Sequence, residues 1–193
     1  MTTVLGAPES RPARRRILDT ASTLFYAQGV HAVGIDRIIA EAAVAKATFY
    51  NHFATKDELV RAYIQEQSQL QRDAVAQFAQ LPARQALLTI FDVLVQIALG
   101  PAFRGCPFIN VAAEYPDPAH PVRQAIADHR RWFRTVLRDL LVADGRPDAD
   151  TTADILVVLR DGLVVGSDLD DPHRLRAVIS DALTRVIGTS STR

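Results

Sequence analysis

The 193-residue sequence predicts an all-helical fold of about nine helices, on three observations. Apolar residues recur three and four positions apart in one segment after another, which is the spacing of one helix face. Glycines and prolines interrupt these segments where helices would end or begin. No segment has the pattern of a strand, and the chain shows neither an internal repeat nor a low-complexity stretch. The sequence therefore predicts a chain built from helices alone.

The composition excludes several classes of protein. Hydrophobic residues make up 48% of the chain, enough for a sizeable core, and no run of about 18 apolar residues could span a membrane. Residues 1–10 lack the apolar segment of a secretory signal and are expected to form a mobile tail. Cys106 is the single cysteine, which excludes a disulfide framework within the chain. The cytoplasm is therefore the expected compartment.

The sequence contains no arrangement of residues that points to catalysis. The histidines are scattered, and no cluster of His, Cys and carboxylates has the spacing of metal ligands. Neither a nucleophile–base pair nor a phosphate-binding loop is evident. We therefore expect no enzymatic activity, no metal and no cofactor.

The N-terminal part predicts three helices. The first spans about residues 11–28 and ends before Gly29, which tolerates a positive φ. The second, at about residues 35–42, spaces its apolar side chains for burial. The third, at about residues 46–53, crowds hydrogen-bonding side chains around two phenylalanines. Two short helices joined by a tight turn, the second dense in polar groups, predict a helix-turn-helix that inserts into the major groove of DNA.

The formal net charge of zero hides a basic N-terminal part. Residues 11–56 contain seven Lys or Arg and three acids, a local balance of +4. DNA phosphates respond to such a local patch and not to the sum over a distant domain. Arg14, Arg15 and Arg16 could contact phosphates or form the solvated basic end of a helix, and the sequence leaves both interpretations open.

The remaining helices are recognised by their ends. Thr55–Glu58 is a capping box, whose hydroxyl and carboxylate can accept from the free N–H groups of a helix start. Three prolines in residues 115–121 leave no room for regular structure. Asp171 caps the final helix, and Pro172 occupies its first turn, where a missing N–H costs nothing. These helices are expected at about residues 55–79, 85–99, 105–114, 122–142, 150–165 and 171–187.

Residues 43–59 combine aromatic, basic and hydroxyl positions in the order Ala-Val-Ala-Lys-Ala-Thr-Phe-Tyr-Asn-His-Phe-Ala-Thr-Lys-Asp-Glu-Leu. The TetR/AcrR family of bacterial repressors carries a motif like Gly-Val-Ser-Lys-Gly-Thr-Phe-Tyr-x-His/Tyr-Phe-x-x-Lys-x-x-Leu. The segment of about residues 14–59 resembles that family, and the match is specific because it fixes many positions together. Residues 105–110, with Glu114 and Pro116, are similar to the regulatory domain of one subfamily.

Two residues depart from the family pattern. Ala43 stands where the turn usually has a glycine, and Ala45 stands where a serine usually caps the recognition helix. An alanine in a left-handed conformation and a missing cap each cost roughly 1 kcal/mol. Neither change removes a contacting side chain, so we expect a weaker turn and retained DNA binding.

The resemblance implies a role for each polar residue of the third helix. Lys46 and Asn51 are candidates for base edges, since lysine can donate to guanine and asparagine can pair with adenine. Ala47 is a candidate for contact with a thymine methyl. Tyr50 is expected to face DNA because its neighbours are polar, whereas Phe53 is expected in the core. The residues at phosphate-contacting positions are Thr48, Tyr50, His52 and Lys56.

The regulatory part contains candidates for an effector site. The aromatic candidates could also be plain core residues, which is the commoner role of such residues in a helical domain. Arg160 interrupts an apolar helix, and it could pair with Asp154 or Asp161 or hold the carboxylate of an effector. A lone cysteine such as Cys106 is more often a small buried hydrophobe than a redox sensor. The candidates are Phe91, Phe108, Tyr115, His129, Trp132 and Arg160.

The last two helices predict a dimer interface. Gly162 and Gly166 stand four residues apart on an apolar face, where small residues let two helices approach closely. With the final helix, this hairpin would form a four-helix interface across a two-fold axis, which the family resemblance also implies. An operator with two half-sites requires a dimer. The expected interface residues are Leu159, Gly162, Gly166, Leu175, Val178, Ile179, Ala182 and Val186.

The sequence and the resemblance together predict a ligand-responsive repressor. Residues 11–57 would form a three-helix DNA-binding domain, and residues 58–193 a helical domain for effector binding and dimerisation. The homodimer would bind a palindromic DNA operator and be released by a small-molecule effector, although the sequence leaves activation open. The alternative is a small-molecule binding or carrier protein whose helix-turn-helix is purely structural.

Overall fold

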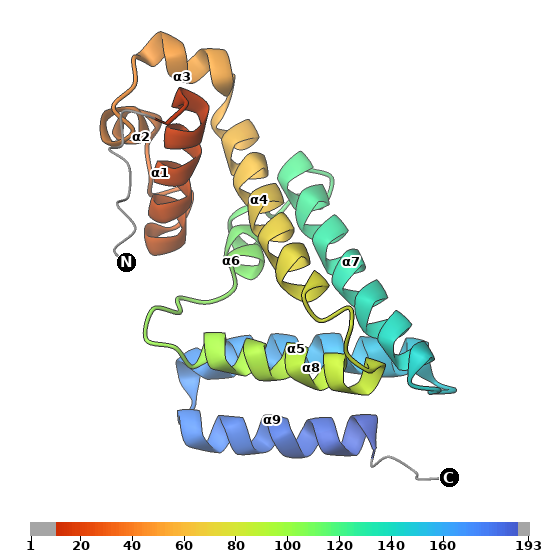
Figure 1. Cartoon of the computed structure of the whole chain (residues 1–193). Helices are drawn as coiled ribbons and strands as arrows, with labels where there is room; N and C mark the ends of the chain where they lie inside the picture. Colours follow the sequence, from red (N-terminus) through yellow and green to blue (C-terminus); the bar gives the residue numbers. More distant parts are fainter. Residues whose placement is uncertain (1–10, 189–193) are drawn as a thin grey trace, which may run out of the picture. The chain divides into compact units, whose positions relative to one another are not determined.

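The computed structural model describes residues 11–188, which form nine α-helices and contain no strand (Figure 1). The all-helical prediction is confirmed for this part of the chain, and the tail expected at residues 1–10 lies outside it. None of these helices is long and apolar enough to cross a membrane. The helices are α1 (Ala13–Gln28), α2 (Ile35–Glu41), α3 (Lys46–His52), α4 (Lys56–Ala76), α5 (Ala83–Ala98), α6 (Pro107–Glu114), α7 (Pro121–Ala143), α8 (Ala149–Leu169) and α9 (Pro172–Ile187).

The predicted helix ends are confirmed where one specific residue makes them. Gly29 follows α1 with a φ of 86°. At the start of α4 the Thr55 hydroxyl accepts from the N–H of Glu58, whose carboxylate accepts a backbone N–H in return. The Asp171 carboxylate accepts a backbone N–H in the first turn of α9. These local signals act within a few residues, which is why the sequence alone could locate them.

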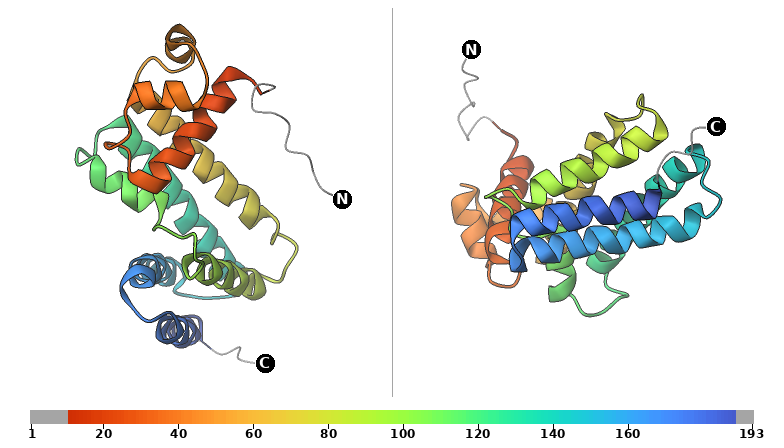
Figure 2. Two further views of the ribbon diagram at one scale, coloured as in Figure 1. Left: turned by 90° about the vertical axis from the view of Figure 1, so that its left-hand side faces the viewer. Right: turned by 90° about the horizontal axis from the view of Figure 1, so that it is seen from below.

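Helix α8 is longer than predicted, since it runs to Leu169 and not to about residue 165. Gly166 does not end the helix. A Cβ built on Gly166 would lie 3.0 Å from Leu175 Cδ1 of α9, so the small size of this glycine serves the close packing of two neighbouring helices. Figures 1 and 2 show α8 and α9 side by side and antiparallel.

The described residues divide into two compact units. The N-terminal unit comprises residues 11–69 and 107–126, and the C-terminal unit comprises residues 70–106 and 127–188. Helices α4 and α7 each contribute to both units. The whole of α6 thus groups with the first three helices, although the sequence assigned it to the second domain. The functional boundary near residue 57 stays a prediction.

Burial of apolar helix faces holds the N-terminal unit together. Ile17 of α1, Ile38 of α2 and Phe49 of α3 are fully buried, in agreement with the spacing that predicted them. Tyr63 of α4 is also buried, and its ring meets Phe25 edge-on with the ring centroids 5.9 Å apart. Burying one such side chain stabilises the fold by about 1.5–3 kcal/mol. Helices α2 and α3 are too short to be stable alone, so packing against the rest of the unit stabilises them.

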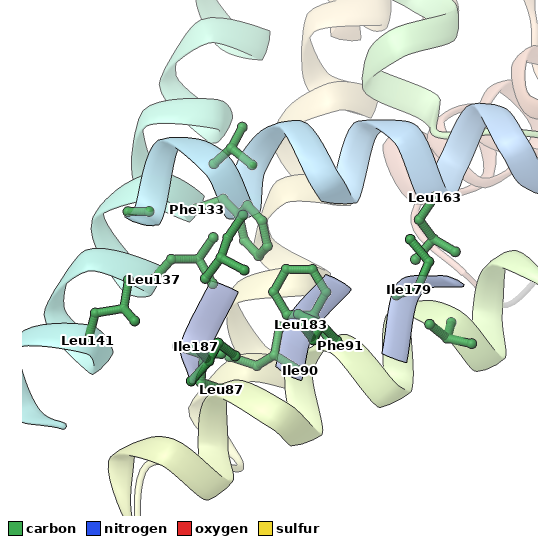
Figure 3. Close-up of a cluster of buried hydrophobic side chains, with 14 of the residues drawn as sticks. Leu87, Ile90, Phe91, Phe133, Leu137, Leu141, Leu163, Ile179, Leu183 and Ile187 are labelled. Atoms are coloured by element: carbon green, nitrogen blue, oxygen red, sulfur yellow. The ribbon is translucent and has the colours of Figure 1, made fainter. Parts of the chain in front are cut away.

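The core of the C-terminal unit is formed by α5, α7, α8 and α9 (Figure 3). Phe91 of α5 and Phe133 of α7 lie in this core among leucines and isoleucines from all four helices. Phe91 is therefore a core residue, the simpler of its two sequence interpretations. The aliphatic residues labelled in Figure 3 are Leu87, Ile90, Leu137, Leu141, Leu163, Ile179, Leu183 and Ile187.

Candidate nucleic-acid interface

Helix α3 turns its aromatic anchors to the core and its polar side chains to solvent. Phe49 and Phe53 are buried, as predicted, with ring centroids 6.3 Å apart. Tyr50 is 42% exposed, and its ring meets Phe49 edge-on. Thr48 is half-buried. The remaining exposed residues of the helix are Lys46, Ala47, Asn51 and His52.

The exposed face of α3 carries the chemical groups that DNA recognition needs. The ammonium of Lys46 and the amide of Asn51 can bond to base edges, and hydroxyl and imidazole groups can bond to phosphates. Lys46 Nζ lies 3.4 Å from Asp36 Oδ1, but both side chains are highly exposed. Such an ion pair is weak, so it leaves the lysine free to meet another partner.

The turn between α2 and α3 contains the left-handed residue of a Schellman helix ending. Ala43 has a φ of 50°, and its N–H donates to Ala40 O at 3.2 Å. The N–H of Val44 donates to Ile39 O at 3.3 Å, which completes the motif. No side-chain cap begins α3 at Ala45. Both departures from the family pattern are therefore present in the structure as unfavourable local features.

The three arginines near the start of α1 have partners within the chain. Arg15 pairs with two carboxylates, and the guanidinium of Arg14 lies 5.0 Å from the ring centroid of Phe53. Arg16 donates to two carbonyl oxygens of the turn, 26 and 27 residues away along the chain. Sequence reasoning missed this contact, because no local pattern connects a residue of α1 to carbonyls that become neighbours only after folding.

Lys56 is the first residue of α4 and is half-buried. Burial lowers its pKa, whereas the nearby carboxylates of Glu114 and Asp57 act in the opposite direction by favouring the ammonium form. A lysine beside the free N–H groups of a helix start is well suited to a backbone phosphate. This placement agrees with the phosphate contact that the resemblance implies, and the contact itself stays a prediction.

Two neighbouring residues at the end of α6 bond to the loop after α1 and to the first turn of α4, within the N-terminal unit. The Glu114 carboxylate accepts from the N–H of Val30 at 2.8 Å and from the N–H of His31 at 2.6 Å. Tyr115 Oη donates to Asp57 Oδ1 at 2.7 Å, and burial followed by this hydrogen bond raises the pKa of the tyrosine. Sequence reasoning did not find this anchor, since it considered Tyr115 only as an effector contact or a plain core residue.

Three predicted effector residues, His129 and its neighbours Trp132 and Arg160, lie in the C-terminal unit. His129 is 5% exposed, and its ring centroid lies 5.4 Å from that of Trp132. Burial, followed by the positive charge of Arg160 and of a second arginine, lowers the pKa of His129 to about 3, so its imidazole is neutral at pH 7. Arg160 pairs with Asp161 at 3.0 Å, one of the two partners considered for it, and also donates to Cys106 Sγ at 2.9 Å.

The other effector candidates are dispersed. Phe91 is packed in the C-terminal core, whereas Phe108 and Tyr115 are buried in the N-terminal unit. Cys106 is buried as well, which agrees with the interpretation of a small hydrophobe. Contact of any of these residues with an effector stays a prediction.

The residues expected at a dimer interface lie on different faces of α8 and α9. Gly166, Leu175 and Ile179 are buried within the chain, so internal packing accounts for the apolar character that suggested an interface. Gly162 and Val178 are exposed. The half-buried members of the set are Leu159, Ala182 and Val186.

A second apolar stripe of α8 extends beyond the interface residues that the sequence predicted. Ile155, Val158, Val165 and Leu169 are exposed, and Val158 is exposed to 67%. With Gly162 they follow a spacing of three and four residues, so they share one helix face. The sequence contained the signal, because α8 is apolar on two faces, but only packing shows which face the chain itself covers.

Comparison with known proteins identifies the family. A model of bacterial regulatory proteins of the TetR family matches residues 17–63, and a model of the tetracycline repressor-like C-terminal domain matches residues 83–182. The HTH-type transcriptional regulator LmrA of Bacillus subtilis is 26% identical, over 69% of this chain and 73% of its own length.

Solved structures agree with the family models. A TetR-family transcriptional regulator from Streptomyces coelicolor has a TM-score of 0.85 and 41% identity, over 91% of this chain and 94% of that chain. A transcriptional regulator from Saccharomonospora viridis, solved in complex with choline, has a TM-score of 0.73 and 25% identity, over 89% of this chain and 95% of that chain. The chain therefore belongs to the TetR family and is a DNA-binding, non-enzymatic transcriptional regulator with a helix-turn-helix.

Proposed function

We propose that the chain is a homodimeric, ligand-responsive repressor that binds a palindromic operator and is released by a small-molecule effector. The division of α3 into a buried aromatic side and an exposed polar side carries the DNA part of this proposal. Lys46 and Asn51 read base edges in the major groove, and Ala47 meets a thymine methyl. Thr48, Tyr50, His52 and Lys56 bond to phosphates and set the register of the helix on the duplex.

The exposed apolar stripe of α8 supports the homodimer. A face formed by Ile155, Val158, Val165 and Leu169 loses solvent contact when a second copy covers it. Gly162 lies within this stripe, and a Cβ built on it would meet nothing within 4 Å, so the surface there is open to a partner helix. Val178 adds exposed apolar surface on α9. A dimer would supply the two recognition helices that an operator with two half-sites requires.

The buried polar residues around His129 support effector binding. A neutral imidazole can both donate and accept. The guanidinium of Arg72 lies over the Trp132 ring, 4.5 Å from its centroid, and Arg160 adds a buried positive charge that pairs with Asp161. The Saccharomonospora viridis relative, solved with choline, supports small-molecule binding by this chain. Arg160 would repel a cationic ligand, so choline itself is not the expected effector of this protein. Effector binding would favour a conformation whose two recognition helices no longer match successive grooves.

Selection of bound duplexes from a random DNA pool tests the proposal. The expected outcome is a palindromic consensus with two half-sites one helical turn apart. Placed across a promoter, that sequence should lower reporter expression when the protein is produced. A consensus with one unpaired half-site would contradict the dimer, and increased expression would contradict repression.

The same selection tests base reading by Asn51. Asn51→Ala should relax the preference at one base pair of each half-site by about 1–3 kcal/mol, because a bidentate amide contact is lost. His52→Ala is the control, since it removes a phosphate-contact candidate on the same helix and should leave the consensus unchanged. An identical consensus for Asn51→Ala and the wild type would show that Asn51 does not read bases.

A further inference from the structure

The helix-turn-helix turn is held from outside by Arg16 of α1. Arg16 Nε donates to Ala42 O at 3.1 Å, and its Nη2 donates to Ala43 O at 3.0 Å. These carbonyls follow the last turn of α2, where backbone acceptors have no partner within the helix. The planar guanidinium fork suits two acceptors that lie side by side. Its positive charge also meets the negative end of the α2 dipole.

The turn needs this support because its own residues are unfavourable. Ala43 adopts a φ of 50°, which costs a residue with a Cβ roughly 1–2 kcal/mol. Ala45 contributes no side-chain cap to α3. Helix α3 has seven residues, too few to be stable alone. Its direction is therefore set by the turn at one end and by the packing of Phe49 and Phe53 along its length.

We propose that Arg16 is a positioning residue for the recognition helix. It stabilises the left-handed conformation of Ala43 and so takes over the role of the glycine that this turn lacks. Arg16 contributes to DNA binding through the backbone of the turn and not by contacting a phosphate. The inference rests on DNA binding by α3, and it requires neither the dimer nor the effector.

The competing role of Arg16 is a phosphate contact, and the two roles predict different results for Arg16→Lys. A lysine keeps the positive charge, so a phosphate contact would be largely retained. A lysine has no planar fork for two adjacent carbonyls, so the support of the turn would be lost. Under our proposal Arg16→Lys and Arg16→Gln are both impaired, and Ala43→Gly rescues both because glycine adopts the positive φ without strain.

The experiment measures the affinity of each variant for a duplex selected by the wild-type protein, over a range of salt concentrations. Arg16→Gln and Arg16→Lys should each bind about tenfold more weakly, since each loses charge-assisted hydrogen bonds to the turn. The salt dependence should keep its wild-type slope, because no phosphate contact is removed. Adding Ala43→Gly should recover most of the affinity in both backgrounds, whereas Ala43→Gly alone should change it less than about twofold.

Arg15→Gln is the matched control. It removes the same charge from the neighbouring position of α1, where the side chain pairs with Asp19 and Glu66 and does not touch the turn. Ala43→Gly should not rescue any loss that this variant shows. Rescue of Arg15→Gln to the same extent as Arg16→Gln would overturn the proposal, because the glycine would then act as a general stabiliser.

Two further results would overturn the proposal. In the first, Arg16→Lys binds with wild-type affinity and Arg16→Gln has a salt slope lowered by about one unit. Together these results would identify a phosphate contact. The second comes from hydrogen exchange without DNA. Amides of α3 should exchange faster in Arg16→Gln and return to the wild-type rate with Ala43→Gly, and unchanged exchange would refute the contact. If the wild type selects no duplex, DNA recognition fails, and hydrogen exchange still decides the role of Arg16.

Discussion

Phe49 and Tyr50 are neighbours on α3 and have different surroundings. Phe49 is buried, and Tyr50 is 42% exposed although its ring packs against Phe49. The sequence favoured this outcome because polar residues flank Tyr50 while helical spacing places Phe49 with Phe53. At the residue scale, local polarity was a sufficient guide for α3. It was not sufficient for Arg16 or Glu114, whose partners are backbone groups far away in the sequence.

Lys56→Ala is expected to weaken binding to all DNA sequences about equally. The loss of one phosphate contact should also reduce the slope of log K against log salt by roughly one unit. Tyr50→Phe should weaken binding uniformly and leave the slope unchanged, since it removes a hydroxyl and no charge. Arg37→Ala is the control for charge, because Arg37 pairs with Glu41 on α2. The affinities are measured by fluorescence anisotropy with selected and scrambled duplexes. An altered base preference for Lys56→Ala, at an unchanged salt slope, would contradict a phosphate contact by Lys56.

Burial of neutral His129 is expected to make the fold sensitive to acid. The pKa of His129 in the folded chain is about 3, below the value of about 6.5 in an unfolded chain. Above pH 6.5 the residue is neutral in both states and its contribution to stability is complete. Between pH 6.5 and 3 only the unfolded state takes up the proton, so the free energy of unfolding falls by up to about 1.4 kcal/mol per pH unit.

Urea unfolding of the wild type and of His129→Gln at several pH values between 5 and 7.5 measures this effect. The variant should lose less stability than the wild type as the pH falls. His173→Gln, at an exposed histidine of α9, is the control and should follow the wild type. Parallel pH profiles for His129→Gln and the wild type would show that His129 does not cause the acid sensitivity.

At the scale of elements, the C-terminal end of α6 stabilises the loop after α1 through hydrogen bonds. The carboxylate of Glu114 accepts both N–H groups that follow Gly29, so the start of the loop after α1 depends on a residue of α6. Two requirements therefore meet at Gly29, a positive φ and space for this carboxylate. A Cβ built there would lie 3.2 Å from Glu114 Oε1.

Gly29→Ala is expected to lower the free energy of unfolding by about 1–3 kcal/mol, because the alanine is strained at φ 86° and crowds the carboxylate. Gly34→Ala is the matched control. Gly34 has a φ of −77°, and a Cβ built on it would meet nothing within 4 Å, so its loss should be limited to the poorer helix N-cap that alanine makes at the start of α2, below about 1 kcal/mol. Chemical denaturation compares the two variants. Gly29→Ala should lose more stability than Gly34→Ala, and equal losses would refute the special role of Gly29.

At the scale of the whole molecule, the proposed repressor depends on a second copy of the chain. The exposed stripe of α8 is the surface that a partner would cover. A charge placed there would be buried without a partner group on dimerisation, which is strongly unfavourable. A charge on an exposed apolar residue elsewhere would remain in water.

Val158→Asp, Val178→Asp and Gly162→Leu are expected to convert the dimer to a monomer and to weaken operator binding. The leucine acts by its volume, since it would push the facing helices apart where glycine lets them close. Val142→Asp is the control, because Val142 is an exposed apolar residue of α7 outside the stripe. Sedimentation velocity reports the mass, and a dimeric mass retained in all three variants would place the interface elsewhere.

The sequence by itself determined the helices, the helix ends that a capping residue or Gly29 makes, and the helix-turn-helix, because periodicity, capping and turn residues act over a few positions. The motif at residues 43–59 also indicated the family, which the comparisons confirm. Only the tertiary structure decided which apolar face of α8 the chain covers, since α9 packs on one face of a helix that is apolar on two. It also decided that Arg16 and Glu114 bond to distant backbone groups, because such contacts depend on how the helices pack and leave no periodic pattern in the sequence.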